Sequence, residues 1–150
     1  MKKIFLLVAC LFLMNSNAAT SAATCKTDCE AHRKASYRAM LDIPWVKGSS
    51  EQAKKERADL LYVAATEMLA FLNTHCQDCK LGGCPANLKQ FDDIVVKSAK
   101  ASLEEFVKKY EKAVAAGKLV DVIYSRKAES AINSVTNLMP VYESKTCPTK

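Results

Sequence analysis

Six cysteines downstream of an N-terminal leader constrain the fold more than any other feature of this sequence. They are Cys25, Cys29, Cys76, Cys79, Cys84 and Cys147, whereas the seventh cysteine, Cys10, lies inside the leader. An even number of cysteines in an exported domain is explained most simply by disulfide bonds. The sequence therefore predicts a domain that is closed by three disulfides.

Residues 1–23 have the three-part order of a cleavable secretory signal peptide. Lys2 and Lys3 precede an uncharged apolar stretch, and small residues with several cleavage options follow within residues 18–23. The apolar stretch is shorter than the roughly 20 residues that span a bilayer. The residues before Cys10 have the letters of a lipoprotein lipobox, but the apolar run continues beyond Cys10, so a cleaved leader is the better interpretation. We expect a secreted or periplasmic mature chain without a transmembrane span.

The remaining residues, 24–150, are predicted to form one helical domain. Ala, Leu, Val, Lys and Glu dominate this part of the chain, and they favour helix. Ser49, with Gln52 three residues later, has capping-box order, Gly117 is a helix terminator, and Pro140 should end the last helix. The expected helices cover residues 25–41, 50–75, 86–116 and 118–139, and a tail follows over residues 140–150. The predicted fold is an all-α up-and-down four-helix bundle tied by three disulfides and preceded by a signal-peptide helix.

The spacing of apolar residues predicts which side chains of the last two helices face the core. In the third helix the expected inward residues are Leu88, Phe91, Val95, Ser98, Ser102, Phe106, Tyr110 and Val114. In the fourth helix they are Val120, Ile123, Ala131, Val135 and Leu138. Both faces assume regular α-helix throughout.

The order of the helices predicts how the cysteines pair. Short connections make consecutive helices antiparallel, which brings all six cysteines to one end of the bundle. The tail after the fourth helix can extend over about 25 Å and reach that end. We therefore expect the pairs Cys84–Cys147, Cys25–Cys79 and Cys29–Cys76, which are one of the 15 connectivities of six cysteines.

A metal site built from the same end of the bundle is an alternative to the disulfides. Its ligands would be thiolates and imidazoles drawn from Cys25, Cys29, His32, His75, Cys76 and Cys79. Export favours oxidised cysteines, so we expect no bound metal. The segment Cys76-Gln77-Asp78-Cys79-Lys80 is similar to the active haem site of multihaem nitrite reductases over five residues alone, and c-type attachment needs CxxCH. No cofactor is expected.

The sequence carries no recognised catalytic motif, because GxSxG, HExxH and the Glu-x-x-His of di-iron bundles are all missing. The net charge of +6 falls to +4 when Lys2 and Lys3 leave with the leader, and no aromatic residues alternate with the later lysines. A nucleic-acid partner is therefore not expected. These absences favour binding over catalysis.

One segment, Pro44-Trp45-Val46, is a candidate partner-binding site. An exposed Trp45 would be an anchor for a partner, whereas a buried Trp45 would close the open end of the bundle. We expect the buried arrangement.

The expected function is a non-enzymatic binding or structural role, such as an envelope or secretion-system accessory or an inhibitor. Its partner would be another exported or envelope protein. Two alternatives remain open, a secreted membrane-active effector and a metal-handling protein.

Overall fold

The fold is seen in a computed structural model, which describes residues 17–76, 78 and 84–145. All regular structure in these residues is helical, as the sequence predicts. The elements in chain order are α1 (Asn17–Asp42), the 3₁₀ turn η1 (Ile43–Trp45), α2 (Glu51–Asn73), α4 (Pro85–Phe91), the π-helical turn η2 (Asp92–Val96), α5 (Lys97–Ala115) and α6 (Val122–Ser144). Since α4, η2 and α5 follow one another without a break, they correspond to the single third helix expected from the sequence. Residues 1–16 of the expected leader lie outside the described residues.

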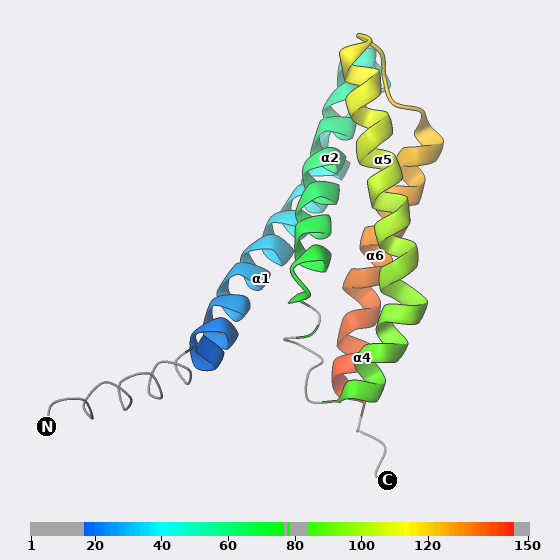
Figure 1. The fold of residues 1–150 in the computed structure, drawn as a ribbon. Coiled ribbons are helices and arrows are strands. Elements are labelled where there is room, and N and C mark those ends of the chain that lie inside the picture. The colour runs from blue at the N-terminus through cyan, green and yellow to red at the C-terminus, as the bar shows by residue number, and fades with distance from the viewer. Residues whose placement is uncertain (1–16, 77, 79–83, 146–150) are drawn as a thin grey trace, which may run out of the picture.

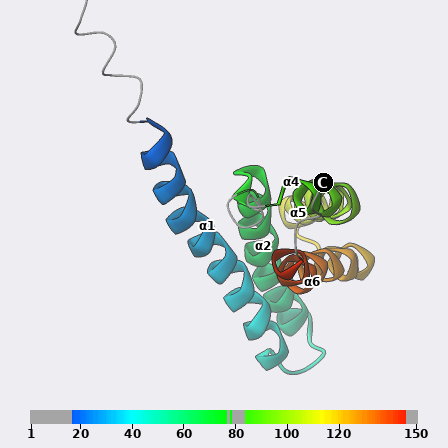
Figure 2. The same cartoon turned by 90° about the horizontal axis from the view of Figure 1, so that it is seen from below.

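The four expected helices are present, but they do not share one core equally. Helices α2, α5 and α6 pack on one another, while α1 lies along α2 and has no comparable contact with α5 or α6. Figures 1 and 2 show α1 diverging from the other helices toward its N-terminal end. The buried part of α1 consists of small side chains, Cys29, Ser36 and Ala39. Such a narrow face is enough for one neighbour, so the fold is a three-helix core with α1 attached to one side.

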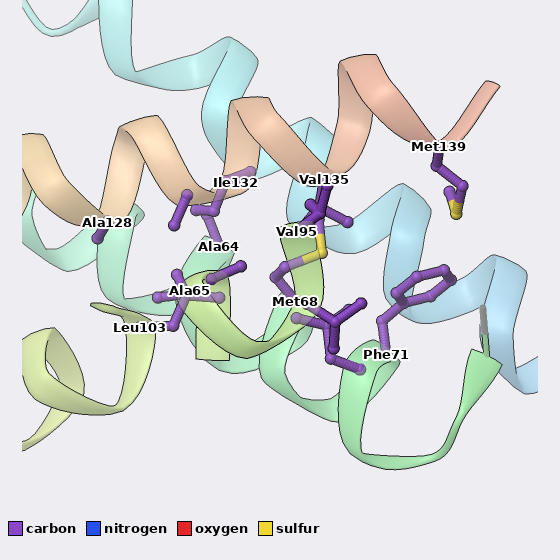
Figure 3. Close-up of a cluster of buried hydrophobic side chains, with 14 of the residues drawn as sticks. Ala64, Ala65, Met68, Phe71, Val95, Leu103, Ala128, Ile132, Val135 and Met139 are labelled. Carbon is purple, nitrogen blue, oxygen red and sulfur yellow. The ribbon is translucent and has the colours of Figure 1, made fainter. Parts of the chain in front are cut away.

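Small residues bring the helices of the core close together. Ala64 and Ala65 of α2 lie near Leu103 of α5 and Ala128 of α6, and all four are buried (Figure 3). Larger side chains fill the space above and below them. The largest fully buried ones are Phe71, Phe91, Phe106, Leu61, Met68, Leu72, Leu103, Ile132 and Val135.

The π-helical turn η2 changes which residues of the third helix face the core. A π turn holds one more residue than an α turn, so it rotates the following helix relative to the preceding one. Val95 and Val96 are therefore both buried, and Ala99 and Leu103 then face inward. The sequence prediction of Ser98 and Ser102 as inward residues is wrong: Ser98 is exposed and Ser102 half-buried, and the residues one position later, Ala99 and Leu103, are buried instead.

One carboxylate links the two sides of this turn. Asp93 accepts a hydrogen bond from Lys89 at 2.7 Å and from Lys97 at 2.5 Å. These two ammonium groups lower the pKa of Asp93 to about 2.

The end of α5 and the start of α6 are set by local chemistry. Gly117 has a φ of +64°, and the amides of Gly117 and Lys118 donate to the carbonyls of Val114 and Ala113, each at 2.9 Å. This is a Schellman motif, and it confirms the predicted helix end. Helix α6 starts four residues later than expected, because the Asp121 carboxylate accepts from the Ile123 amide and caps it there. In α2, similarly, the cap is Ser50 and not the expected Ser49.

The prediction that Pro140 ends the last helix is wrong, since α6 continues to Ser144. Proline lacks an amide hydrogen and crowds the preceding turn, so contacts elsewhere must offset that local cost. Tyr142 is buried, and its ring packs edge-on to the Phe91 ring with 5.3 Å between the two ring centroids. The Asn87 side chain also donates to the backbone carbonyls of Tyr142 and Lys145, at 3.2 and 3.1 Å. These contacts with α4 hold the last turn of α6 in place.

The expected inward face of α6 is also displaced. Ile123 and Leu138 are exposed, whereas Ala128, Ile132 and Met139 are buried. Ala131 and Val135 face the core as predicted.

Two leucine variants test which residues of α5 and α6 face the core. Leu103→Ala removes a fully buried side chain and should lower the free energy of unfolding by about 2–5 kcal/mol. Leu138→Ala, at a site that is 38% exposed, should change it by less than about 1 kcal/mol. Urea unfolding followed by circular dichroism measures both. Equal losses would contradict the placement of Leu103 in the core and of Leu138 at the surface.

Candidate functional site

A buried disulfide joins α1 to the end of α2. Cys29 and Cys76 are both buried, and their Cα atoms lie 5.3 Å apart across the bond. This is one of the three pairs expected from the order of the helices. It holds α1 against α2 near the end of the molecule where α2 ends, α4 begins and α6 ends (Figure 1).

The other two expected pairs involve side chains outside the described residues. Cys79 and Cys147 are not described, and neither is the side chain of Cys25. Cys84 is itself in a disulfide. Its partner is therefore a cysteine whose side chain the structure does not describe, because Cys29 and Cys76 are bonded to each other. Cys25–Cys79 and Cys84–Cys147 remain predictions.

Two polar contacts also fix α1 on α2. The Ser36 hydroxyl is buried and donates to the carbonyl of Ala64 at 2.8 Å. One turn away, His32 Nδ1 lies 2.7 Å from Glu67 Oε2. The small inner face of α1 is thus held by one covalent bond and two hydrogen bonds.

The structure does not assemble the alternative metal site. Cys29 and Cys76 are bonded to each other and are not available as thiolate ligands. His32 is engaged by Glu67, and His75 Nδ1 lies 3.8 Å from a carboxylate oxygen of Asp78. Within residues 17–76, 78 and 84–145, no three His, Cys, Asp or Glu side chains are arranged to hold a metal ion.

Trp45 is the most exposed large apolar side chain of the described residues, at 77%. The expectation that it closes the open end of the bundle is wrong. Ile43, two residues earlier, is half-buried and packs against the core, because it continues the inward spacing of Ala39 and Met40. Trp45, two residues further on, then points to solvent.

The segment that follows Trp45 is held in place by Arg57 of α2. Its guanidinium donates from Nη1 to the carbonyls of Val46 and Gly48, at 2.8 and 2.9 Å. Gly48 has a φ of +96°, a conformation that other residues rarely adopt. Ser50 then caps α2. Trp45 is therefore presented on an ordered loop, and the role of Arg57 is not visible in the sequence.

Two more apolar side chains extend the exposed surface along α1. Tyr37 is 52% exposed and Leu41 is 50% exposed, and four-residue steps lead from Tyr37 to Leu41 and on to Trp45. Residues four apart share one side of an α-helix, so Tyr37 and Leu41 lie on the same side of α1, and Trp45 follows in the 3₁₀ turn η1 just beyond the end of α1. The repeat of large apolar residues at this spacing, on the side opposite the buried one, is the signal that could have identified this surface from the sequence.

Cations flank this row of apolar residues. Lys34, Arg38 and Lys47 are all exposed. We call these residues together the Trp45 face; its members are Lys34, Tyr37, Arg38, Leu41, Trp45 and Lys47.

A second surface feature is a groove of about 410 Å³ between α5 and α6. Hydroxyls of Ser98, Ser102, Ser130 and Ser134 line it, with Arg126 and Lys127 toward one end. Lys127 is paired with Glu105 at 3.2 Å. The lining includes no acid and no histidine, so it offers no general base for chemistry on a bound molecule.

Comparison with known protein families, curated proteins and solved structures finds no match to this chain. Among the described helices, none has the length and apolar character needed to cross a membrane. The functional assignment therefore depends on the surface around Trp45 and on the disulfide that supports it.

A peptide map of the oxidised protein tests the disulfide framework. Digestion with trypsin and Asp-N cuts after Lys26, between Gln77 and Asp78 and after Lys80, so each of the six cysteines is released on its own peptide. Cys29 should be found linked to Cys76, and Cys84 to Cys147. The Cys84 link is expected because Asn87 holds Lys145 beside the start of α4. A link between Cys76 and Cys79 would contradict both the structure and the expected connectivity.

The Arg57 clamp is tested by fluorescence, because Trp45 is the single tryptophan of the chain. Its emission should be that of a water-exposed indole. Arg57→Ala removes both loop hydrogen bonds, so the emission anisotropy of Trp45 should fall and the free energy of unfolding should drop by about 1 kcal/mol. Lys55→Ala, an exposed change on the same helix, is the control and should leave the anisotropy unchanged. A buried-type emission in the unmodified protein would contradict the exposed Trp45.

Proposed function

We propose that this chain is an exported, disulfide-stabilised helical protein that acts by binding, and that the Trp45 face is its contact surface. The observation that carries the proposal is a tryptophan 77% exposed on a loop clamped by Arg57. Export is inferred from the leader sequence, and a disulfide is compatible with an oxidising compartment.

An exposed, ordered tryptophan is suited to recognition. Tryptophan is enriched among the residues that contribute most to binding. A loop that is already ordered loses little conformational entropy when a partner arrives. Because Tyr37 and Leu41 extend the same surface, a partner can cover several large side chains at once.

The titratable groups favour binding over catalysis. Burial and the hydrogen bond to Asp59 raise the pKa of Tyr110 to about 12, and two lysines lower the pKa of Asp93 to about 2. An effective general acid or base has a pKa near the working pH. Both shifts move the pKa of the group further from 7.

The alternatives fit this surface less well. A membrane-active effector that inserts released helices would have to free α1, which a buried disulfide ties to α2. A metal-handling protein would need that same pair of cysteines as thiolates.

Site-specific photo-crosslinking in the expressing cell tests the proposed function. A benzophenone amino acid at Leu41 lies on the Trp45 face, and one at Val141 is the matched control, since the two sites are 50% and 48% exposed. Adducts, to protein or to lipid, should form from position 41 in several-fold higher yield than from position 141. Adding Trp45→Ala should lower the adduct yield at position 41 several-fold. Equal yields at the two sites, or no effect of Trp45→Ala, would contradict a binding role for this face.

A further inference from the structure

We propose that the Trp45 face docks on the surface of a lipid bilayer that contains anionic lipids. The inference rests on the binding role proposed above and names the class of partner. It concerns a peripheral contact in which α1 stays packed on α2.

The shape and chemistry of the apolar row fit the bilayer interface. Tyrosine and tryptophan have an apolar ring and a polar group, and both favour the level of the lipid headgroups. Tyr37 and Leu41 are exposed on α1, and Trp45 is exposed in η1 just beyond the end of that helix. The buried residues Ser36 and Ala39 face α2, so α1 can lie on a membrane with its outer side while its inner side keeps its contacts.

The charge around the row is complementary to anionic headgroups. From residue 34 to residue 47 the chain has three cations, Lys34, Arg38 and Lys47, and a single acid, Asp42. None of the three cations forms an ion pair with any residue that the structure describes. Glu30, the nearest acid on the preceding turn, is already paired with Arg33.

The composition of the face favours lipid over a protein partner. Protein interfaces are depleted in lysine, whereas lysine and arginine beside a row of aromatic residues are typical of helices that lie on anionic membranes. Two of the three cations here are lysines on long, exposed side chains. A bilayer surface offers anionic headgroups to the cations and a boundary between polar and apolar layers to the aromatic rings.

Vesicle binding tests the proposal, with Trp45 as the probe. The processed, oxidised protein is purified from the cells that export it and mixed with vesicles of phosphatidylcholine alone or of phosphatidylcholine with phosphatidylglycerol. The emission of Trp45 should shift to the blue and be quenched by brominated lipid with the anionic vesicles only. Added salt should reverse the shift, because it screens the charges. No shift with the anionic vesicles would overturn the proposal.

Matched variants separate the face from the overall charge of the protein. Replacing Lys34, Arg38 and Lys47 by Gln should weaken binding on the order of 100-fold, about five-fold for each cation. Replacing Lys108, Lys112 and Lys118 by Gln removes the same charge from exposed sites elsewhere and should weaken binding less than about ten-fold. Every variant has the same N-terminus, so any contribution of residues 1–23 to vesicle binding is the same in all of them. Equal losses in the two triple variants would overturn the proposal.

Sedimentation with vesicles tests the aromatic residue itself. The Trp45→Ala variant should have a partition coefficient for the vesicles about ten-fold lower than that of the unmodified protein. Its circular dichroism spectrum should be unchanged. Val141→Ala is the control at an exposed apolar site of α6 and should bind as the unmodified protein does.

The two proposals fail in different ways. If vesicles do not bind and the adduct at position 41 is a single protein, the membrane partner is overturned and the binding role of the face stands. If neither vesicles nor adducts depend on Trp45, both are overturned.

Discussion

The attachment of α1 to α2 determines where the exposed surface around Trp45 points. The inner side of α1 is narrow and built of small residues, so apolar burial alone holds it weakly. The Cys29–Cys76 bond closes a segment with a sequence separation of 47, which corresponds to about 4 kcal/mol of stabilisation in a chain-entropy account. At the other end of the helix, Ile43 packs against the core and Arg57 holds the following loop. With α1 fixed at both ends, its outer side and Trp45 have a defined orientation.

Tertiary contacts override local rules at two places in the core. Pro140 should end α6, yet the helix continues because Tyr142 packs on Phe91 and Asn87 holds the last carbonyls. The π turn η2 interrupts regular helix so that Val95 and Val96 can both be buried. In each case side chains on a neighbouring helix, distant in sequence, decide the local backbone.

The difference between local sequence rules and tertiary contacts also explains which parts of the fold could be predicted. Helix content, the stop at Gly117 and the pairing of Cys29 with Cys76 follow from composition, one glycine and helix order. The π turn could not be predicted, because both the expected Ser98 and Ser102 and the observed Ala99 and Leu103 are compatible with helical spacing from Val95. Trp45 was assigned to the wrong environment because the sequence does not show that Ile43, and not Trp45, packs against the core. The Arg57 clamp joins a side chain to backbone carbonyls, and such a contact has no sequence pattern.

The disulfide between Cys29 and Cys76 has a mechanical consequence. Together with the backbone it makes a closed covalent ring, and Trp45 lies within that ring. A protease that cut the loop near Gly48 would leave two pieces still joined. If Trp45 were held by a partner and the rest of the molecule pulled away, the load would reach α2 by two covalent routes, one through the loop after Trp45 and one along α1 and through the sulfur atoms. Helix α1 would therefore be tied to α2 at both of its ends while the load lasts.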